Sequence, residues 1–406
     1  MHSSLRTGMS VFLAGFLLTM SQAGNAVTVA QMPLFISAGV TPNVMLVVDN
    51  SGSMNSVIWA EAFDSKTNYV DWSRVNNGNS AWNSDSGSVM TSSLTSNTWR
   101  TSGAGIDCAA NWSRGRKSDG TIKCLKLPDP VGGGNTRYLG NYLNYLFQTY
   151  AGGTDLTGGQ IPNTYRMAVA RNVATDVVNN NSNLRLGLTR FNTDAGGQVI
   201  RNCGSSTTDL NNSIAGLTAT TWTPLAETLY EVTRYFRGMS SQYNTGVNYT
   251  SPIRYRCQKN FVIVITDGYP TQDETFPNND PADVADTARA LPNWDNLAPA
   301  TLASDYPNFP QYSDGFKTGA NTDEGNTLYL DDMAKFAYDI DMRTGNDDTG
   351  KSFDGIDNPQ QNLVTYTVGF TAANQMLADA AEYGTGRYYQ ANDQASLTIP
   401  LQAALA

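Results

Sequence analysis

Two short polar clusters in this sequence carry the side chains that could do chemistry. The first, residues 49–53 (DNSGS), follows the apolar run 43–48, and the second, residues 266–268 (TDG), follows the apolar run 261–265. Both runs are continuous and rich in β-branched residues, which is typical of buried parallel strands. In an open α/β sheet, ligands bind beyond the carboxyl ends of the strands. We therefore expect the two clusters to meet at one edge of a sheet.

Oxygen atoms dominate the side chains of these clusters. Asp49 and Asp267 would supply carboxylates, and Ser51 and Ser53 would supply hydroxyls from one turn, in which Gly52 lets both serines point the same way. Hard divalent cations prefer such ligands and keep some of their water. Because the set has few formal negative charges, a bound cation would stay electrophilic and could accept a further carboxylate. The sequence therefore predicts a site for Mg²⁺, with Mn²⁺ or Ca²⁺ as alternatives.

The histidine count excludes several other kinds of site. The only histidine is His2, in a segment that is expected to be removed, and without imidazole there is no Ser-His-Asp catalysis, Cys-His catalysis or His-ligated zinc. The 36 acidic residues outnumber the 26 basic ones and give a net charge of -10, whereas nucleic-acid binding needs clustered Lys and Arg. We therefore expect neither an enzyme nor a nucleic-acid partner.

Residues 1–26 have the pattern of a secretory signal peptide. Arg6 precedes the apolar run 9–20, and Gly24 and Ala26 supply the small residues of a cleavage site. The run is shorter than the about 20 residues that span a bilayer, and no later segment is long and apolar enough to do so. We expect an exported protein without a transmembrane span after signal removal, and an uncleaved anchor is the alternative.

Four cysteines in an exported chain predict two disulfides. The favoured pairs are Cys108 with Cys124 and Cys203 with Cys257, because each pair flanks its own loop. The other pairings stay open, and so does a thiolate zinc site, although the sequence has no Cys-x-x-Cys pair.

Strand patterns and helix patterns alternate over residues 40–406. Apolar runs and alternation predict the strands 43–48, 184–188, 198–200, 261–265, 363–368 and 387–390. Helical spacing predicts the helices 166–178, 224–236, 327–341, 376–382 and 394–404. This alternation predicts one α/β domain with a doubly wound, mostly parallel sheet of the Rossmann type. Two large loop-rich insertions, at about 55–160 and 269–325, interrupt the domain.

The first insertion is rich in tryptophan and in small polar residues. It would be stapled by a disulfide between Cys108 and Cys124. Its aromatic side chains could form a platform for a carbohydrate or a protein partner, or they could form a small local core, which is the favoured interpretation. Five of the seven tryptophans lie in it: Trp59, Trp72, Trp82, Trp99 and Trp112.

Two other motifs do not indicate a binding site. Residues 345–352 (GNDDTGKS) match the letters of a nucleotide-binding loop, but a helical pattern precedes them where a strand is needed. Asp347 and Asp348 would also place negative charge where phosphates should lie. The acidic runs 347–357 and 280–286 lack the spacing of a calcium-binding EF-hand loop, so we expect solvated loops there.

Residues 49–53 resemble the DxSxS motif of von Willebrand factor A domains. The resemblance implies a metal-ion-dependent adhesion site, which a threonine from a loop and an aspartate from a later strand end complete. Thr223, in the stretch 221–227 (TWTPLAE), and Asp267 match these two positions. The resemblance implies that both serines bind the metal directly, that the aspartates act directly or through water, and that the threonine joins according to the conformational state. The implied metal ligands are Asp49, Ser51, Ser53, Thr223 and Asp267.

Further stretches resemble the PilY/PilC family of type IV pilus tip-associated adhesins and biogenesis factors. They are 49–54 (DNSGSM), 223–227 (TPLAE), 364–370 (VTYTVGF), 377–381 (LADAA) and 384–389 (GTGRYY). Members of that family usually continue into a C-terminal β-propeller. This chain ends at Ala406, so it is expected to be a fragment or a shortened relative.

The resemblance implies a metal-dependent adhesion module in the periplasm, at the cell surface or at the pilus tip. The cation would engage an acidic group of a protein partner, either a pilus subunit or a host surface ligand that presents a carboxylate. The alternative is a structural pilus-assembly or mechanosensing factor in which the metal site is secondary.

Overall fold

The computed structural model describes residues 40–72, 87–95, 108–268, 270–275, 277, 279–280, 290–294, 327–370 and 375–391. These residues all belong to one compact unit, Pro33–Ala406. The predicted signal peptide 1–26, the predicted helix 394–404 and most of the stretch 269–325 lie outside them. Within the described ranges, no helix has the length and apolar character needed to cross a membrane.

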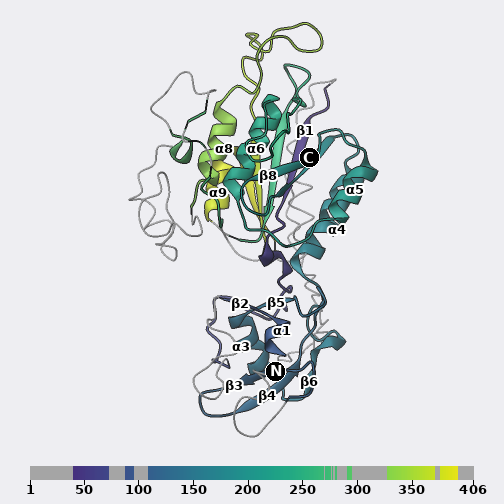
Figure 1. The fold of residues 1–406 in the computed structure, drawn as a ribbon, viewed down its shortest axis with the longest axis vertical. Helices are drawn as coiled ribbons and strands as arrows, with labels where there is room; N and C mark the ends of the chain where they lie inside the picture. The colour runs from purple at the N-terminus through teal and green to yellow at the C-terminus, as the bar shows by residue number, and fades with distance from the viewer. Residues whose placement is uncertain are drawn as a thin grey trace, which may run out of the picture. The chain divides into compact units, whose positions relative to one another are not determined.

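A six-stranded sheet forms the centre of the fold (Figure 1). Strand β1 pairs in parallel with β7 and β9, β10 pairs in parallel with β9 and β11, and β8 runs antiparallel to β7 at one edge. Numbered along the chain, the strands lie in the order 3-2-1-4-5-6 of doubly wound folds, which reverses between β1 and β9. The predicted fold class is therefore confirmed. The strands are β1 Asn43–Val48, β7 Arg185–Phe191, β8 Gly197–Arg201, β9 Asn260–Thr266, β10 Val364–Phe370 and β11 Thr385–Ala391.

Helices cover both faces of this sheet (Figure 1). Met45 and Val47 of β1 pack into the core under α6, α8 and α9, whereas Val44 and Leu46 pack into the core under α4 and α5. Because both faces of the strand are buried, residues 44–48 are all apolar, and only Asn43 at its start is polar. The helices are α4 Arg166–Asn180, α5 Thr207–Ala215, α6 Leu225–Arg237, α8 Leu330–Asp339 and α9 Gln375–Tyr383.

The predicted strands and helices within the described residues are all present, with ends that differ by a few residues. Helix α5 was not predicted, because its sequence is mostly polar and buries only Leu210 and Ile214. Its start is fixed by Ser206, whose hydroxyl oxygen accepts a hydrogen bond from the Asp209 N–H at 3.1 Å.

The described part of the first insertion has a core of its own, as favoured, and it also has short strands and helices that the sequence did not predict. Trp72 is 2% exposed and stacks on Phe147 with ring centroids 6.0 Å apart. Trp59 packs against the same core, so these two tryptophans support the local-core interpretation; Trp82 and Trp99 lie outside the described residues. The elements are β2 Ser88–Met90, α1 Thr91–Leu94, β3 Ser113–Arg116, β4 Ile122–Lys126, β5 Arg137–Leu139, α3 Gly140–Thr149, β6 Thr154–Asp155 and the 3-10 helix η3 Leu156–Gly158.

One of the two predicted disulfides is present. Cys108 and Cys124 are bonded, with Cα atoms 5.5 Å apart, and they staple the insertion as expected. The second prediction is wrong, since Cys203 and Cys257 are free thiols. Cys203 lies in the core beside Tyr235, whereas Cys257 belongs to the turn that precedes β9. The positions of cysteines around a loop do not reveal that one of the side chains points into the core.

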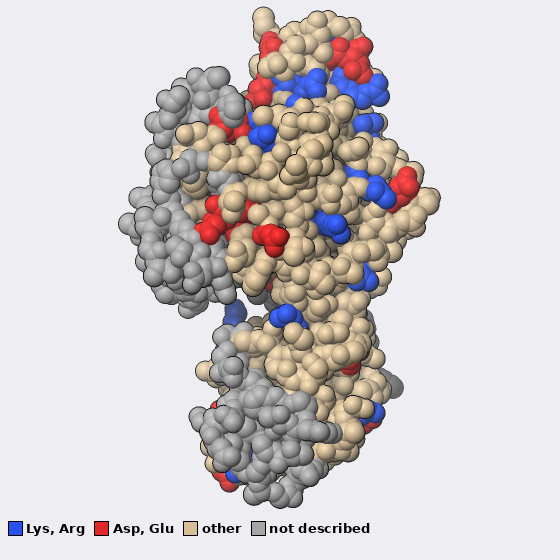
Figure 2. Space-filling model, viewed as in Figure 1, with Lys and Arg blue, Asp and Glu red and all other residues tan. Residues whose placement is uncertain are grey.

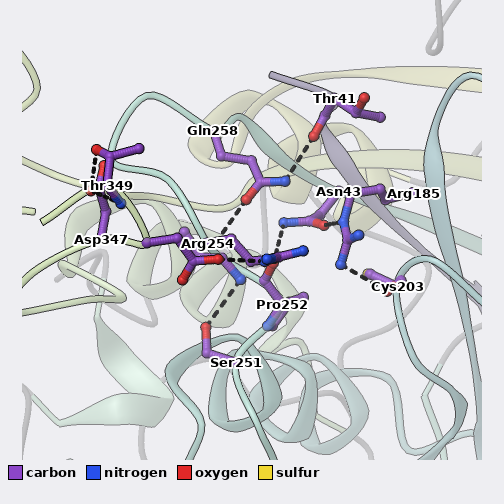
Figure 3. A network of polar contacts seen from close by, with 12 residues as sticks. Thr41, Asn43, Arg185, Cys203, Ser251, Pro252, Arg254, Gln258, Asp347 and Thr349 are labelled. Atoms are coloured by element: carbon purple, nitrogen blue, oxygen red, sulfur yellow. Dashed lines mark hydrogen bonds and ion pairs between the residues drawn. The ribbon is translucent and has the colours of Figure 1, made fainter. Parts of the chain in front are cut away.

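The amino ends of the sheet strands are tied by a polar network (Figure 3). The amide of Asn43, at the start of β1, donates to Asn260 Oδ1 at 2.9 Å and to Pro252 O at 3.2 Å. Its oxygen accepts from Arg185 Nε at 2.9 Å, and Gln258 Nε2 donates to Thr41 O at 2.7 Å. These neutral and cationic donors therefore join the starts of β1, β7 and β9.

Candidate metal centre

Asp49 follows β1, at the carboxyl edge of the sheet and beside the point where the strand order reverses. Its side chain is fully buried. One carboxylate oxygen accepts from the Ser51 N–H at 2.7 Å, and the other accepts from the Thr266 hydroxyl, at the end of β9, at 2.6 Å. The backbone also holds this position, because the Asp49 N–H donates to Ile265 O at 2.9 Å. The two predicted clusters therefore meet as expected.

Three further side chains form a row of oxygen atoms next to Asp49. The hydroxyls of Ser51 and Ser53 lie 2.8 Å apart, and the Ser53 hydroxyl donates to Asp267 Oδ1 at 2.7 Å. Ser51 precedes the 3-10 helix η1 (Gly52–Asn55), and Ser53 lies within it. The sequence separation between Ser53 and Asp267 is 214 residues, so only the parallel pairing of β1 with β9 brings them together.

Gly52 serves the site differently from the prediction. Its φ angle is not among the positive values of the described glycines, so the turn does not depend on a left-handed conformation. A Cβ added there would lie 3.2 Å from Nη2 of Arg137, a residue of the insertion strand β5. Glycine therefore lets the arginine of the insertion approach the backbone between the two serines.

Asp267 has a partner that the sequence analysis did not anticipate. Nη1 of Arg166 lies 2.6 Å from its Oδ2, and this ion pair is buried, with the side chains 10% and 0% exposed respectively. Arg166 is the first residue of α4, where the chain returns from the first insertion. The two residues are 101 positions apart, and no local pattern in the sequence indicates their contact.

The loop that carries Thr223 lies beside the turn of the two serines. The N–H groups of Thr220 and Thr221 donate to Asn50 O at 2.9 and 3.2 Å, and the Gly52 N–H donates to Thr221 O at 2.9 Å. Thr223 itself is buried, and its N–H donates to Thr271 Oγ1 at 3.0 Å. Within the described residues, its hydroxyl makes no hydrogen bond to the other four predicted ligands. Those four are linked to one another by hydrogen bonds of the two serines.

Burial and the charge of Asp267 both disfavour the charged form of Asp49. Burial, together with the nearby charge of Asp267, raises the pKa of Asp49 from 3.8 to about 7, against the opposing effect of its hydrogen bonds from Ser51 and Thr266. A buried carboxylate in this state gains from a cation beside it, because the cation offsets both the lost hydration and the repulsion.

The oxygen spacing is compatible with a hard cation. Mg²⁺ binds six oxygens octahedrally at 2.0–2.1 Å, which places neighbouring ligands about 2.9 Å apart, and the row of Ser51, Ser53 and Asp267 oxygens has spacings of 2.7–2.8 Å. Over the described ranges there is no cluster of three or more His, Cys, Asp or Glu side chains suited to a metal. A cation held here would therefore depend on the serine hydroxyls as well as on the carboxylates.

The acidic loops outside this edge have structural partners. The Asp347 carboxylate accepts from the N–H groups of Thr349 and Lys351 at 2.8 and 3.0 Å, which occupies the donors that a nucleotide-binding loop would offer to phosphates.

Asp280 was expected to be solvated, and this is wrong: it is buried and paired with Arg237 at 2.6 Å, while Tyr230 donates to it at 2.7 Å.

Several solved structures are similar to this chain. The vWF domain of the type V pili tip protein Mfa5 from Porphyromonas gingivalis is 12% identical, with 90% of this chain and 94% of that chain covered and a TM-score of 0.38. The conserved hypothetical protein BatB from Bacteroides thetaiotaomicron is 10% identical, with 90% and 98% covered and a TM-score of 0.34. The pilus adhesin SpaC from Lactobacillus rhamnosus GG, in an open conformation, is 12% identical, with 59% and 27% covered and a TM-score of 0.28.

No protein-family model matches the sequence, and no curated protein matches it. At these identities and TM-scores the structural likeness concerns the fold alone. The fold class rests on the strand order of the sheet and on the helices that cover its two faces.

Proposed function

We propose that the carboxyl edge of the sheet holds a divalent cation and that the protein uses this cation to bind an acidic group of a protein partner. The observation that carries the proposal is the row of closely spaced oxygens contributed by two strand ends at the switch point of the sheet. A bound Mg²⁺, Mn²⁺ or Ca²⁺ would supply an electrophilic acceptor for a carboxylate. The residues proposed to hold it are Asp49, Ser51, Ser53, Thr223 and Asp267.

The surrounding contacts hold these ligands in place before any cation binds. Thr266 fixes the Asp49 carboxylate. Asn50 Oδ1 accepts from the Phe191 N–H at 2.8 Å, which ties the turn after β1 to the end of β7. Such preorganisation lowers the entropy cost of binding, because few side chains need to be immobilised.

The proposed setting is an exported protein of the PilY/PilC type, located in the periplasm, at the cell surface or at the pilus tip. The proposed partners are pilus subunits or a host surface ligand with an exposed carboxylate. This setting is supported by the sequence resemblance and the secretory pattern of residues 1–26. On the face shown in Figure 2, the basic side chains at the upper end lie beside acidic ones and the others are scattered. Together with the net charge of -10, this favours a protein partner over nucleic acid. We propose a binding role without catalysis.

Calorimetric titration of the mature protein with Mg²⁺, Mn²⁺ and Ca²⁺ tests the site. Wild type should bind at least one of these ions, and Asp49→Ala should weaken its binding at least 100-fold. Asp348→Asn is the matched control, since it removes an exposed carboxylate at the opposite edge of the sheet and should bind as wild type does. Absence of binding by wild type, or equal binding by Asp49→Ala, would refute the proposal.

A structural or mechanosensing role in pilus assembly is the second candidate. The first insertion favours it, because a disulfide and an aromatic core make this part of the chain resistant to unfolding. Complementing a deletion strain with Asp49→Ala separates the two functions. Normal piliation with lost adhesion supports the binding role, whereas lost piliation supports the assembly role.

A further inference from the structure

Arg166 occupies a position that bears on the proposed metal site. Its guanidinium is paired with Asp267 Oδ2 at 2.6 Å, while the other oxygen of the same carboxylate accepts from Ser53. The side chain of Arg166 is almost entirely buried, so water screens its charge weakly. A positive charge therefore already neutralises one of the two carboxylates in the cation-free protein.

A divalent cation and this guanidinium compete for the same carboxylate. A cation bound by Ser53 and Asp267 would lie within a few ångströms of Arg166, and like charges repel strongly at such distances in a poorly hydrated environment. Binding is therefore opposed for as long as Arg166 keeps its contact with Asp267. Either the affinity for the cation is low or the guanidinium moves away.

Two contacts also connect Arg166 to the insertion. Its guanidinium carbon lies 5.5 Å from the ring centroid of Trp59, and its backbone N–H donates to Ser56 O at 3.0 Å. Trp59 packs edge-on against Phe63, with ring centroids 5.1 Å apart, and belongs to the aromatic packing that includes Tyr142. One side chain thus touches both the predicted metal ligand and the core of the insertion.

The two ends of the insertion are joined at the same place. Val57, on the outgoing segment, pairs with Tyr165 on the returning segment, and the Ile58 N–H donates to Thr164 O at 3.0 Å. Arg166 follows directly in the chain. A change in the position of its side chain would therefore act on the segment by which the insertion is attached.

We propose that Arg166 is the resident counter-charge of the site and that cation binding displaces its guanidinium from Asp267, which transmits the loaded state through Trp59 to the first insertion. This proposal rests on the proposed function, because it assigns a regulation to the same site. Arg166 acts as a positioning residue for the insertion and as an internal competitor of the cation.

Calorimetric titration with Mn²⁺ tests the competition. Arg166→Gln should bind Mn²⁺ at least tenfold more tightly than wild type, and Arg166→Lys, which keeps the charge, should lie between the two. Arg254→Gln is the matched control: it removes a guanidinium that is paired with the exposed carboxylate of Asp348 at the opposite edge of the sheet, and it should change affinity by no more than about threefold. Equal binding by wild type and Arg166→Gln would overturn this proposal alone, whereas binding by neither would overturn the proposed function as well.

Hydrogen exchange of the backbone amides tests the transmission. Saturation of wild type with Mn²⁺ should change the exchange of residues 57–63, and the same concentration should leave these amides unchanged in Arg166→Gln although its site is filled. Circular dichroism checks that each variant is folded. Unchanged exchange in Mn²⁺-saturated wild type would overturn the proposed link between the site and the insertion. An equal change in both proteins would show that a residue other than Arg166 transmits cation binding to the insertion.

Discussion

Strand β1 has a buried polar residue at each end, and the two ends behave differently. Asn43, at the amino end, is fully buried, and its amide makes three hydrogen bonds to neighbouring strands and loops (Figure 3). Asp49, at the carboxyl end, is equally buried, but it faces the charge of a second carboxylate. The register of the sheet pairs Asn43 with Asn260 at one edge, just as it brings Asp49 to Thr266 at the other.

The difference lies in whether the polar groups satisfy each other. At the amino edge, amides and a guanidinium match donors with acceptors, so the network stabilises the sheet without a ligand. At the carboxyl edge, Asp49 accepts from Ser51 and Thr266, Asp267 accepts from Ser53 and pairs with Arg166, and the charge of Asp267 still disfavours that of Asp49. A carboxylate whose pKa is shifted by burial and by a nearby like charge is typical of a functional site, and in this kind of sheet ligands bind at the carboxyl edge.

The largest expected effect concerns pH and separates the two edges most clearly. The folded-state pKa of Asp49 is raised from 3.8 to about 7, so the folded protein binds this proton more tightly than the unfolded chain does. The stabilisation by the bound proton is complete below about pH 4 and is lost as pH rises through 7. Asp49→Asn removes this titration. The free energy of unfolding of the variant, relative to cation-free wild type, should therefore increase from pH 4 to pH 8 by on the order of 4 kcal/mol.

Chemical denaturation at several pH values measures this difference. Saturating Mg²⁺ at pH 8 should stabilise wild type and leave Asp49→Asn unchanged, which serves as an internal control. Parallel pH profiles for the two proteins would contradict the prediction.

Asn43→Leu should give the next largest effect, and on stability alone. It removes three buried hydrogen bonds and leaves Asn260 Oδ1 and Arg185 Nε without that partner, which should lower the free energy of unfolding by about 3 kcal/mol. Urea denaturation measures the loss. The affinity for Mn²⁺ should stay within twofold of wild type, and a parallel loss of cation binding would show that the two edges are not independent.

Ser53→Ala, at the carboxyl edge, should lower the affinity for the cation and leave stability nearly unchanged, which is the reverse of Asn43→Leu. The cation would lose one hydroxyl ligand, so its affinity should fall about tenfold, or about 1.4 kcal/mol, while stability stays near wild type because Asp267 keeps Arg166. Calorimetry measures the affinity. Ser56→Ala, one turn further along, is the matched control, and an equal loss in both variants would point to a disturbed turn.

The smallest expected effect comes from Asp348→Asn at the amino edge. Asp348 pairs with Arg254 at 2.6 Å, but both side chains are about half exposed. Exposed pairs gain little because water and salt screen them. Thermal unfolding should show no measurable change, and a clear loss would mean that the exposed rim contributes to the network of Figure 3.

Local patterns predicted much of the sheet and part of the site. The runs 43–48 and 261–265 identified β1 and β9, and the polar residues after them identified Asp49 and Asp267. These predictions succeed because the middle of a strand that is buried on both faces is apolar, and the change to polar residues marks where the strand ends. Whether these residues hold a cation stays a prediction.

Other features carried no local signal. The elements of the first insertion are short, and α3 buries Asn144 and several tyrosines among its apolar residues, which hides its helical period. The free Cys203 and Cys257 show the same limit, because flanking a loop does not fix the direction of a side chain.

The sequence by itself determined the order of strands and helices and the residue types at the carboxyl edge, since periodicity and polarity are properties of neighbouring residues. Only the tertiary structure decided which distant groups meet there. It placed Arg166 against Asp267 and Arg137 against Gly52, and it paired Asn43 with Asn260. Such contacts depend on how separate elements pack against each other. The spacing of neighbouring residues in the sequence therefore does not indicate them.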